Sequence, residues 1–220
     1  MSLALFTFKL LAAYLLGSVS GSLVLGRFRG VDIRTQGSGN AGGTNAFRTQ
    51  GAWFALGTVL IDVGKGALAA GLGFWPPEVA GVPPLAQALA CGLACALGHI
   101  WPVFFGFRGG KGAAVVVGMV AVCLPAALLP LVGVWLLLLT FTGYVGLSTV
   151  AAALSLVPSA WWLASAADRT LQTGIAIAVA ALVAYTHRAN LVRLARGTEH
   201  RFEGVRLLAR LRGLAPRRRA

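Results

Sequence analysis

Charged residues are scarce in this chain of 220 residues: they make up only 11% of it, and just six of them are acidic. Hydrophobic residues make up 57%, and the mean hydropathy is +0.78. A soluble domain of this length cannot bury that much apolar surface, so the lipid bilayer must serve as the solvent. We therefore expect one compact, all-α, polytopic membrane domain.

Three further absences limit what the chain can be. Cys91, Cys95 and Cys123 are too few for a disulfide framework, and we interpret them as small apolar packing residues. No cluster of side chains calls for a metal or another cofactor. The N-terminal stretch up to Arg27 lacks a small-x-small cleavage site ahead of a soluble domain, so we expect a retained first span rather than a signal peptide.

Seven stretches are apolar enough for transmembrane helices, which need about 20 mainly apolar residues. They cover 3–26, 52–74, 85–106, 112–125, 127–142, 145–165 and 171–187. The fourth and fifth are short, and Pro125 and Pro130 leave the boundary between them open. Tryptophans near the span ends suit an interfacial aromatic belt: Trp53, Trp75, Trp101, Trp161 and Trp162. The sequence thus predicts a seven-helix membrane domain over 1–187 and a tail over 188–220.

The basic residues are spread unevenly over the loops. Segments 27–51, 107–111 and 188–220 carry four, two and ten of the 19 Lys and Arg, whereas the opposite loops, 75–84 and 166–170, carry one. The positive-inside rule therefore places the C-terminus in the cytoplasm and the N-terminus outside. The same bias accounts for the net charge of +13 without nucleic acid, because no nucleic-acid-binding motif accompanies it.

The predicted tail is basic and partly amphipathic. Arginines interrupt an apolar stripe that suits a helix lying on the inner membrane surface. The stripe consists of Leu191, Leu194, Val205, Leu208, Leu211 and Leu214.

A first polar cluster, GSGNAGGTNAFR, runs from Gly37 to Arg48. Glycines free backbone amides to cradle an anion, and Arg48 adds a fork suited to phosphate. The cluster also fits G-x-G-x-x-G, but that dinucleotide signature needs a preceding strand and a βαβ unit, so we interpret the match as accidental. A plain cytoplasmic loop is the alternative.

A second cluster, GGKG, runs from Gly109 to Gly112. It fails the test for a nucleotide-binding P-loop, because no Gly stands five residues before Gly110 and Gly follows Lys111. It opens a predicted span, where helix N-terminal amides stabilise anions. A positive stop between two helices is the alternative.

A third cluster begins at the end of the seventh span. His187 and Asn190 would share a face if that span continued as a helix, and His187 could act as a base or donate to a hydroxyl. Within the second span, Asp62 and Lys65 could pair with each other or contribute to the site. The sequence leaves both possibilities open.

Together these motifs resemble a known family. The segments GSGNAGGTNAFR, GHIWPVFFGFRGGKGAA and THRANLVRLARGTEHRF are similar, in order and spacing, to those of the bacterial acyl-phosphate:glycerol-3-phosphate acyltransferases, the PlsY family. The resemblance covers nearly the whole chain. It implies transfer of an acyl group from acyl phosphate to the 1-hydroxyl of glycerol 3-phosphate, which makes lysophosphatidic acid and phosphate in the first step of phospholipid synthesis.

The resemblance also implies residue roles. Ser38, Arg48 and Lys111 would bind phosphate, while His187 and Asn190 would orient the glycerol hydroxyls. The other residues expected at the substrates are Gly39, Asn40, Gly42, Thr44, Asn45, Gly109, Gly110, Gly112, Arg188 and Glu199. Whether Ser148 or Thr149, on another predicted cytoplasmic turn, also enters the site stays open.

The resemblance also implies catalysis without a nucleophilic residue, with the donor's own phosphate or His187 as the general base. The chain fits this, because it has neither a convincing Ser-His-Asp set nor an H-x4-D motif. We expect a monomer in the bacterial inner membrane, with a cytoplasmic active site and no cofactor. A transporter or channel for an organic phosphate is the competing class. The almost wholly apolar third to sixth spans argue against it.

Overall fold

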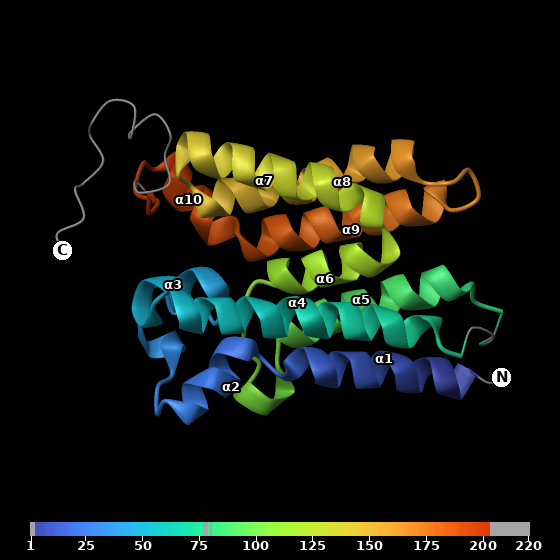
Figure 1. Ribbon diagram of the computed structural model, residues 1–220, viewed down its shortest axis with the longest axis horizontal. Coiled ribbons are helices and arrows are strands. Elements are labelled where there is room, and N and C mark those ends of the chain that lie inside the picture. The colour runs from blue at the N-terminus through green and yellow to red at the C-terminus, as the bar shows by residue number, and fades with distance from the viewer. Residues whose placement is uncertain (1–2, 77–78, 80, 203–220) are drawn as a thin grey trace. The chain divides into compact units, whose positions relative to one another are not determined.

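The computed structural model describes residues 3–76, 79 and 81–202, and helices dominate it (Figure 1). Its α-helices are α1 (Leu3–Ser18), α2 (Gly21–Phe28), α3 (Gly43–Gln50), α4 (Ala52–Phe74), α5 (Pro84–Ile100), α6 (Ala113–Cys123), α7 (Leu128–Thr142), α8 (Val145–Leu163), α9 (Arg169–Thr186) and α10 (Arg188–Ala195). Three short 3₁₀ turns are η1 (Ile33–Thr35), η2 (Val103–Phe105) and η3 (Pro125–Ala127). Within these described residues no strand longer than an isolated bridge forms, which confirms the all-α prediction.

Five helical segments in the described chain are long and apolar enough to cross a membrane. They are α4, α8, α9 and the stretches Pro84–Phe105 and Pro125–Thr142. A sixth arises if α1 and α2 count as one span, bent by 43° at their junction. The remaining predicted span, the fourth (112–125), corresponds to α6, which is a shorter apolar helix of 11 residues.

The predicted span boundaries hold best where nothing interrupts the helix. The second predicted span coincides with α4. The third was predicted to end at 106, but its α-helix, α5, ends at Ile100. Leu124 leaves helical geometry between the fourth and fifth spans, and Pro125, which has no amide to donate, starts the next helical turn. The boundary between these two spans therefore lies at 124–125.

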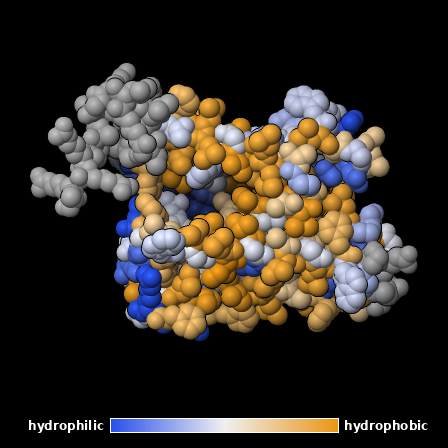
Figure 2. Space-filling model, in the orientation of Figure 1, coloured by the Kyte–Doolittle hydropathy of each residue, from blue (hydrophilic) through white to orange (hydrophobic). Residues whose placement is uncertain are grey.

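Apolar side chains remain exposed along the helices. Phe8 on α1, Leu60 on α4 and Leu129 on α7 keep 64%, 63% and 82% of their surface exposed. In α1–α6, the middle of the visible surface is hydrophobic, and hydrophilic residues gather at the end that carries α2 and α3 (Figure 2). Such a surface is stable only in lipid. The predicted tryptophans lie at helix ends, Trp53 in the first turn of α4 and Trp75 directly after it.

The chain forms two compact units that meet in the sequence between Pro125 and Ala126. The sequence had led us to expect one compact domain. In the first unit, α4 packs against α1, α5 and α6, and α2 and α3 pack against its N-terminal half. In the second, α8 lies between α7 and α9, and the short α10 packs on α8 and α9. The predicted tail stripe from Val205 onward lies outside the described residues.

Glycine lets the helices of the first unit approach closely. A Cβ at Gly17 would lie 2.1 Å from the carbonyl oxygen of Cys95, so α1 could not keep its present position against α5. Small residues at helix interfaces are typical of membrane proteins, where van der Waals packing has to replace the hydrophobic effect between helices. Cys91, Cys95 and Cys123 are buried free thiols in this unit, which confirms their interpretation as packing residues.

Two buried lysines satisfy carbonyls at helix ends. The Lys9 Nζ donates to the carbonyls of Gly73 and Pro76, at 3.2 and 2.8 Å, where α4 ends, and to Oε1 of Gln87 at 2.7 Å. The Lys65 Nζ donates to the carbonyls of Gly17 and Val19, at 2.9 and 2.8 Å, where α1 ends. Both ammonium groups thus stabilise the negative end of a helix dipole and occupy carbonyls that lack a partner within the helix.

Asp62 completes the junction of α1 and α2. Its Oδ1 lies 2.9 Å from the Lys65 Nζ and accepts the amide of Gly21, the first residue of α2, at 3.1 Å. Of the two sequence-based possibilities, pairing between Asp62 and Lys65 is therefore confirmed. One ion pair caps the end of α1 with its cation and the start of α2 with its anion.

Gly17→Ala should destabilise the protein, because its methyl group would collide with the backbone of α5. Overpacking of this kind costs about 1–3 kcal/mol or more. Gly64→Ala in α4 is the matched control, since nothing lies within 4 Å of its Cβ position, and it should be neutral or stabilise by up to about 1 kcal/mol. Thermal unfolding of the two variants in detergent checks this, and equal melting temperatures would contradict the close approach of α1 and α5.

Candidate active site

The loop from α2 to α4 is held together from within by Asn45. This side chain is fully buried; its Oδ1 accepts the amide of Ser38 at 2.9 Å, and its Nδ2 donates to the carbonyls of Ile33 and Gln36. A Cβ at Gly37, where φ is +55°, would lie 2.4 Å from that Oδ1. The sequence-based role of Asn45 as a substrate ligand needs correction: it holds the loop in shape, because its hydrogen-bonding atoms face the loop.

Arg34 joins this first loop to the second one. Its guanidinium pairs with the carboxylate of Asp32 through Nε and Nη2, at 2.7–3.1 Å, and its Nη1 donates to the carbonyls of Phe105 and Arg108 at 2.8 and 3.2 Å. Arg34 is a site residue that sequence reasoning missed. Arg34 lies outside the three motifs, and a lone basic residue in a predicted cytoplasmic loop is already expected from the positive-inside rule. The sequence therefore gave no signal for its role.

The Asp32–Arg34 pair stays charged at neutral pH. Hydrogen bonds from Arg34 hold the pKa of the Asp32 carboxyl below its usual value, and the same bonds raise the pKa of Arg34. The pKa of Asp32 is lower in the folded protein than in the unfolded chain. Its contribution to folding stability is therefore fully present at any pH above the unfolded pKa, and it is lost only as the pH falls through the folded pKa. The link between the two loops therefore does not titrate near neutrality.

The second loop folds back onto the end of α5. The amide of Gly109 donates to the carbonyl of Ile100 at 3.2 Å, and that of Gly110 donates to the carbonyl of His99 at 3.1 Å. A Cβ at Gly110 would lie 2.1 Å from Nε2 of His99, so glycine is required by close approach. The predicted amide cradle needs correction here, because the amides of Gly109 and Gly110 cap α5 instead of facing an anion.

The first two clusters lie next to each other in the first unit. The Ser22 Oγ on α2 donates to the carbonyl of Ala41 at 2.9 Å, and that carbonyl oxygen would lie 3.1 Å from a Cβ at Gly110. Arg34 makes a second contact between the loops that carry these clusters. The sequence could predict two phosphate-type loops, and the fold brings them together.

The predicted phosphate ligands occupy the rim of these loops. Ser38 is exposed, Arg48 is exposed on the last turn of α3, and Lys111 is half-buried two residues before α6. Gly112 caps the N-terminus of α6 with φ +83°, as the helix-N-terminus prediction required. Apart from the buried Asn45, the other predicted substrate residues of the first loop are at least partly accessible: Gly39, Asn40, Gly42 and Thr44.

The third cluster belongs to the second unit, at the junction of α9 and α10. The seventh span does not continue as one helix, because His187 departs from helical geometry with φ −98° and ψ 6°. Its buried ring bonds through Nδ1 to the carbonyl of Val183 at 2.8 Å. Since a carbonyl only accepts, Nδ1 carries a proton; when the ring is neutral, Nε2 is its accepting nitrogen.

Glu199 supports Asn190. Its Oε1 accepts the side-chain amide of Asn190 at 2.5 Å, and its Oε2 accepts Nε of Arg193 at 2.7 Å. The Glu199 side chain is only 7% exposed. The role predicted for Glu199 as a substrate ligand therefore needs correction: both of its oxygens serve to fix neighbouring side chains on α10.

The turn from α7 to α8 is tied to the chain after α10. The amide of Phe202 donates to the carbonyl of Gly143 at 2.9 Å, and Nε of Arg201 donates to the carbonyl of Thr142 at 3.0 Å. Ser148 and Thr149 on α8 donate their hydroxyls to backbone carbonyls one turn earlier. Arg188 donates to the Tyr185 carbonyl and stacks on that ring, with 4.2 Å to its centroid.

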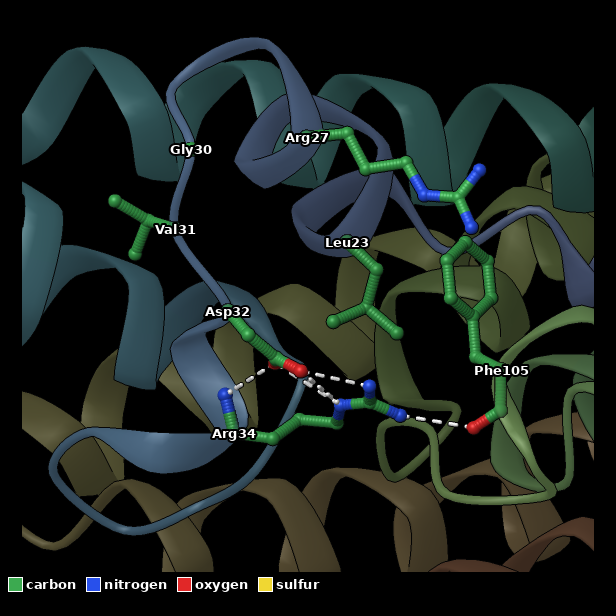
Figure 3. Close-up of a pocket in the computed structure, with 7 residues that line it drawn as sticks. All are labelled: Leu23, Arg27, Gly30, Val31, Asp32, Arg34 and Phe105. Atoms are coloured by element: carbon green, nitrogen blue, oxygen red, sulfur yellow. Dashed lines mark hydrogen bonds and ion pairs between the residues drawn. The ribbon is translucent and has the colours of Figure 1, made fainter.

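A separate cavity of about 360 Å³ opens between α2, η1 and η2 in the first unit (Figure 3). Arg27 covers one side, its guanidinium 5.1 Å from the centroid of the Phe105 ring, and the Asp32–Arg34 pair closes another. The remaining lining residues are Leu23, Gly30 and Val31. None of the predicted phosphate ligands lines this cavity.

Comparison with known proteins identifies the family. Residues 7–197 match the family described as glycerol-3-phosphate acyltransferase. The chain belongs to this family. The glycerol-3-phosphate acyltransferases of Desulforudis audaxviator and Chlorobaculum tepidum are 41% and 36% identical, over 86% and 87% of this chain and 92% and 94% of theirs.

Solved structures agree with this assignment. The crystal structure of PlsY (YgiH), an integral membrane glycerol 3-phosphate acyltransferase, matches in its glycerol 3-phosphate form with a TM-score of 0.77 and 37% identity, over 90% of this chain and 95% of that one. Its lysophosphatidic acid form matches with a TM-score of 0.74 and 36% identity, over the same shares. The family confirms the resemblance read from the three motifs and supports an acyltransferase rather than a transporter. The structure also explains why the G-x-G-x-x-G match is accidental. The 3₁₀ turn η1 precedes Gly37, where a dinucleotide site would need a strand.

Glu199→Ala should lower acyltransferase activity about tenfold, because Asn190 and Arg193 would lose the carboxylate that fixes them. Arg196→Ala, an exposed change on the same segment, is the control and should leave activity unchanged. Initial rates of purified variants check this. Equal rates for Glu199→Ala and Arg196→Ala would show that Asn190 does not depend on Glu199.

Proposed function

We propose that this protein transfers an acyl group from acyl phosphate to the 1-hydroxyl of glycerol 3-phosphate, giving lysophosphatidic acid and phosphate. The observation that carries the proposal is the match, over nine-tenths of the chain, to a solved relative whose two forms are described by glycerol 3-phosphate and lysophosphatidic acid. These two molecules are the acceptor and the product of such a reaction. Membership of the acyltransferase family supports the same chemistry.

Acyl phosphate is the donor we infer. It is an activated mixed anhydride, so the reaction needs a positioned hydroxyl and stabilised oxyanions more than an enzyme nucleophile. The hydroxyl oxygen attacks the acyl carbon, the bond from that carbon to the phosphate oxygen breaks, and phosphate leaves. The hydroxyl proton goes to His187 or to the leaving phosphate.

Arg48, Lys111 and Ser38 hold the phosphate of the acceptor in this proposal. Arg48 offers a bidentate fork, Lys111 a compact charge beside the N-terminus of α6, and Ser38 a neutral donor. Two contacts support their grouping: Arg34 donates from the first loop to carbonyls of the second, and the Ala41 carbonyl lies close to Gly110. Two positive side chains are required because two phosphates must approach each other.

His187 and Asn190 orient the glycerol hydroxyls. With Nδ1 bonded to Val183, the His187 ring presents Nε2 as an acceptor for a hydroxyl proton. Asn190, steadied by Glu199, offers an amide that both donates and accepts. This division leaves His187 able to work as the base or only as the group that aligns the hydroxyl.

We also propose the finer topology: seven spans, with α6 as a short one, the N-terminus outside and the active site on the cytoplasmic side of the bacterial inner membrane. The distribution of Lys and Arg supports this orientation. We further propose that the protein functions as a monomer.

The reaction itself is tested with purified protein, glycerol 3-phosphate and either palmitoyl phosphate or palmitoyl-CoA. We expect lysophosphatidate from the acyl phosphate and none from the CoA ester. Mass spectrometry of the lipid product and release of phosphate provide the readouts. Absence of lysophosphatidate with the acyl phosphate would overturn the proposal.

Arg48→Ala and Lys111→Ala should each lower kcat by about 10²–10³-fold, the typical cost of losing one charge-stabilising contact at a reacting centre. Arg29→Ala, which removes a basic residue from the same loop outside the cluster, should stay within about twofold of wild type. Near-wild-type kinetics in either of the first two variants, with all three proteins equally folded, would contradict the assignment.

The topology is tested by single cysteines at Arg29 and Ala167, both exposed, in a chain whose native cysteines are replaced by alanine. A membrane-impermeant maleimide should label Ala167→Cys in intact cells with a permeabilised outer membrane. It should label Arg29→Cys only after the inner membrane is opened. The reverse pattern would invert the proposed orientation.

A further inference from the structure

The ion pair at the α1–α2 junction has a third member, His99 of α5. Its Nδ1 lies 2.9 Å from the Lys65 Nζ and 3.4 Å from Oδ1 of Asp62. All three side chains are between 2% and 4% exposed. Asp62 is ten residues into α4, about 15 Å along its axis, so this cluster lies deep in a spanning helix.

Burying such a cluster is costly. Replacing a buried ion pair by apolar residues of similar size is often neutral or stabilising, so stability alone gives little reason to place one in lipid. Ionisable residues at this depth usually serve a function. The contacts on either side of the cluster indicate which one.

On one side the cluster fixes the start of the first loop. Asp62 holds the amide of Gly21, and the neighbouring Ser22 holds the carbonyl of Ala41 at 2.9 Å. Ala41 lies inside the first glycine-rich cluster, between Ser38 and Arg48. The position of that cluster therefore depends on where α2 begins.

On the other side the cluster fixes the second loop. The Nε2 edge of the His99 ring abuts Gly110, and the His99 carbonyl accepts the Gly110 amide. Gly110 also lies against the Ala41 carbonyl and directly precedes Lys111. The contacts thus form a closed ring from the ion pair through α2 and Ala41 to Gly110, and back through His99.

We propose that Asp62, Lys65 and His99 are positioning residues for the acyl transfer, which set the first loop and Lys111 at the separation that the two phosphates require. The inference rests on the proposed function of the two loops. A shift of about 1 Å at a reacting centre costs about 10²-fold in rate. Breaking this closed set of contacts should therefore lower kcat strongly even in a variant that still folds.

The chain supplies a matched control in Lys9. Like Lys65 it is buried and caps the carbonyls at one helix end, but its partners are Gly73, Pro76 and Gln87, at the far end of α4. Lys65→Met and Lys9→Met remove equivalent groups. We expect both to lower the melting temperature, and only Lys65→Met to lower kcat per folded molecule, by about 10²-fold.

Two further variants keep the test decisive if Lys65→Met does not fold. His99→Ala leaves the ion pair in place, and Asp62→Asn/Lys65→Met removes both charges together. Each should lose at least tenfold in kcat with a melting temperature no lower than that of Lys9→Met. Wild-type kcat in folded His99→Ala and in the double variant would overturn the inference.

Hydrogen exchange gives a readout independent of catalysis. In nanodiscs, His99→Ala should speed amide exchange in 37–48 and 106–113, whereas Lys9→Met should speed it only near the end of α4. If the wild-type protein makes no lysophosphatidate, the proposed function fails, and this exchange pattern still decides whether the cluster positions the loops. Unchanged exchange at both loops in His99→Ala would overturn it.

Discussion

A charged pair buried in the middle of a spanning helix determines how the first unit is built. The first span bends by 43° between α1 and α2, which leaves carbonyls at one helix end and amides at the next without helical partners. Lipid cannot satisfy those groups, so Lys65 and Asp62 do. The bend in turn gives α2 its direction, and α2 leads directly into the first glycine-rich loop.

Glycine serves three different needs around this site. At Gly17 it lets α1 approach the backbone of α5, at Gly37 it provides a left-handed turn beside Asn45, and at Gly110 it makes room for the His99 ring. Only the second of these is a matter of backbone conformation. Several glycines that read as a phosphate cradle in the sequence therefore serve the packing of the loops, which then present Ser38, Arg48 and Lys111 at their rim.

The sequence predicted much of this protein because hydropathy and charge act locally. The all-α class, the extent of α4 and the short α6 follow from apolar runs and prolines. The three motifs were sufficient to recognise the family. Sequence reasoning failed where the partner of a polar group is set by the folded chain. Asn45 and Glu199 read as ligands for substrate, but each holds groups 6 to 12 residues away in the sequence. Arg34 and His99 have partners much farther along the chain and gave no signal of their own.

The sequence by itself thus determined the solvent, the helices and the kind of chemistry, since each depends on residue type and near neighbours. Tertiary structure alone decided which polar groups face substrate and which hold the loops. Loop residues with the same donors and acceptors can serve either purpose. The difference lies in whether a carbonyl such as that of Ala41 or His99 lies within hydrogen-bonding distance, and only the folded chain brings residues so far apart in sequence together.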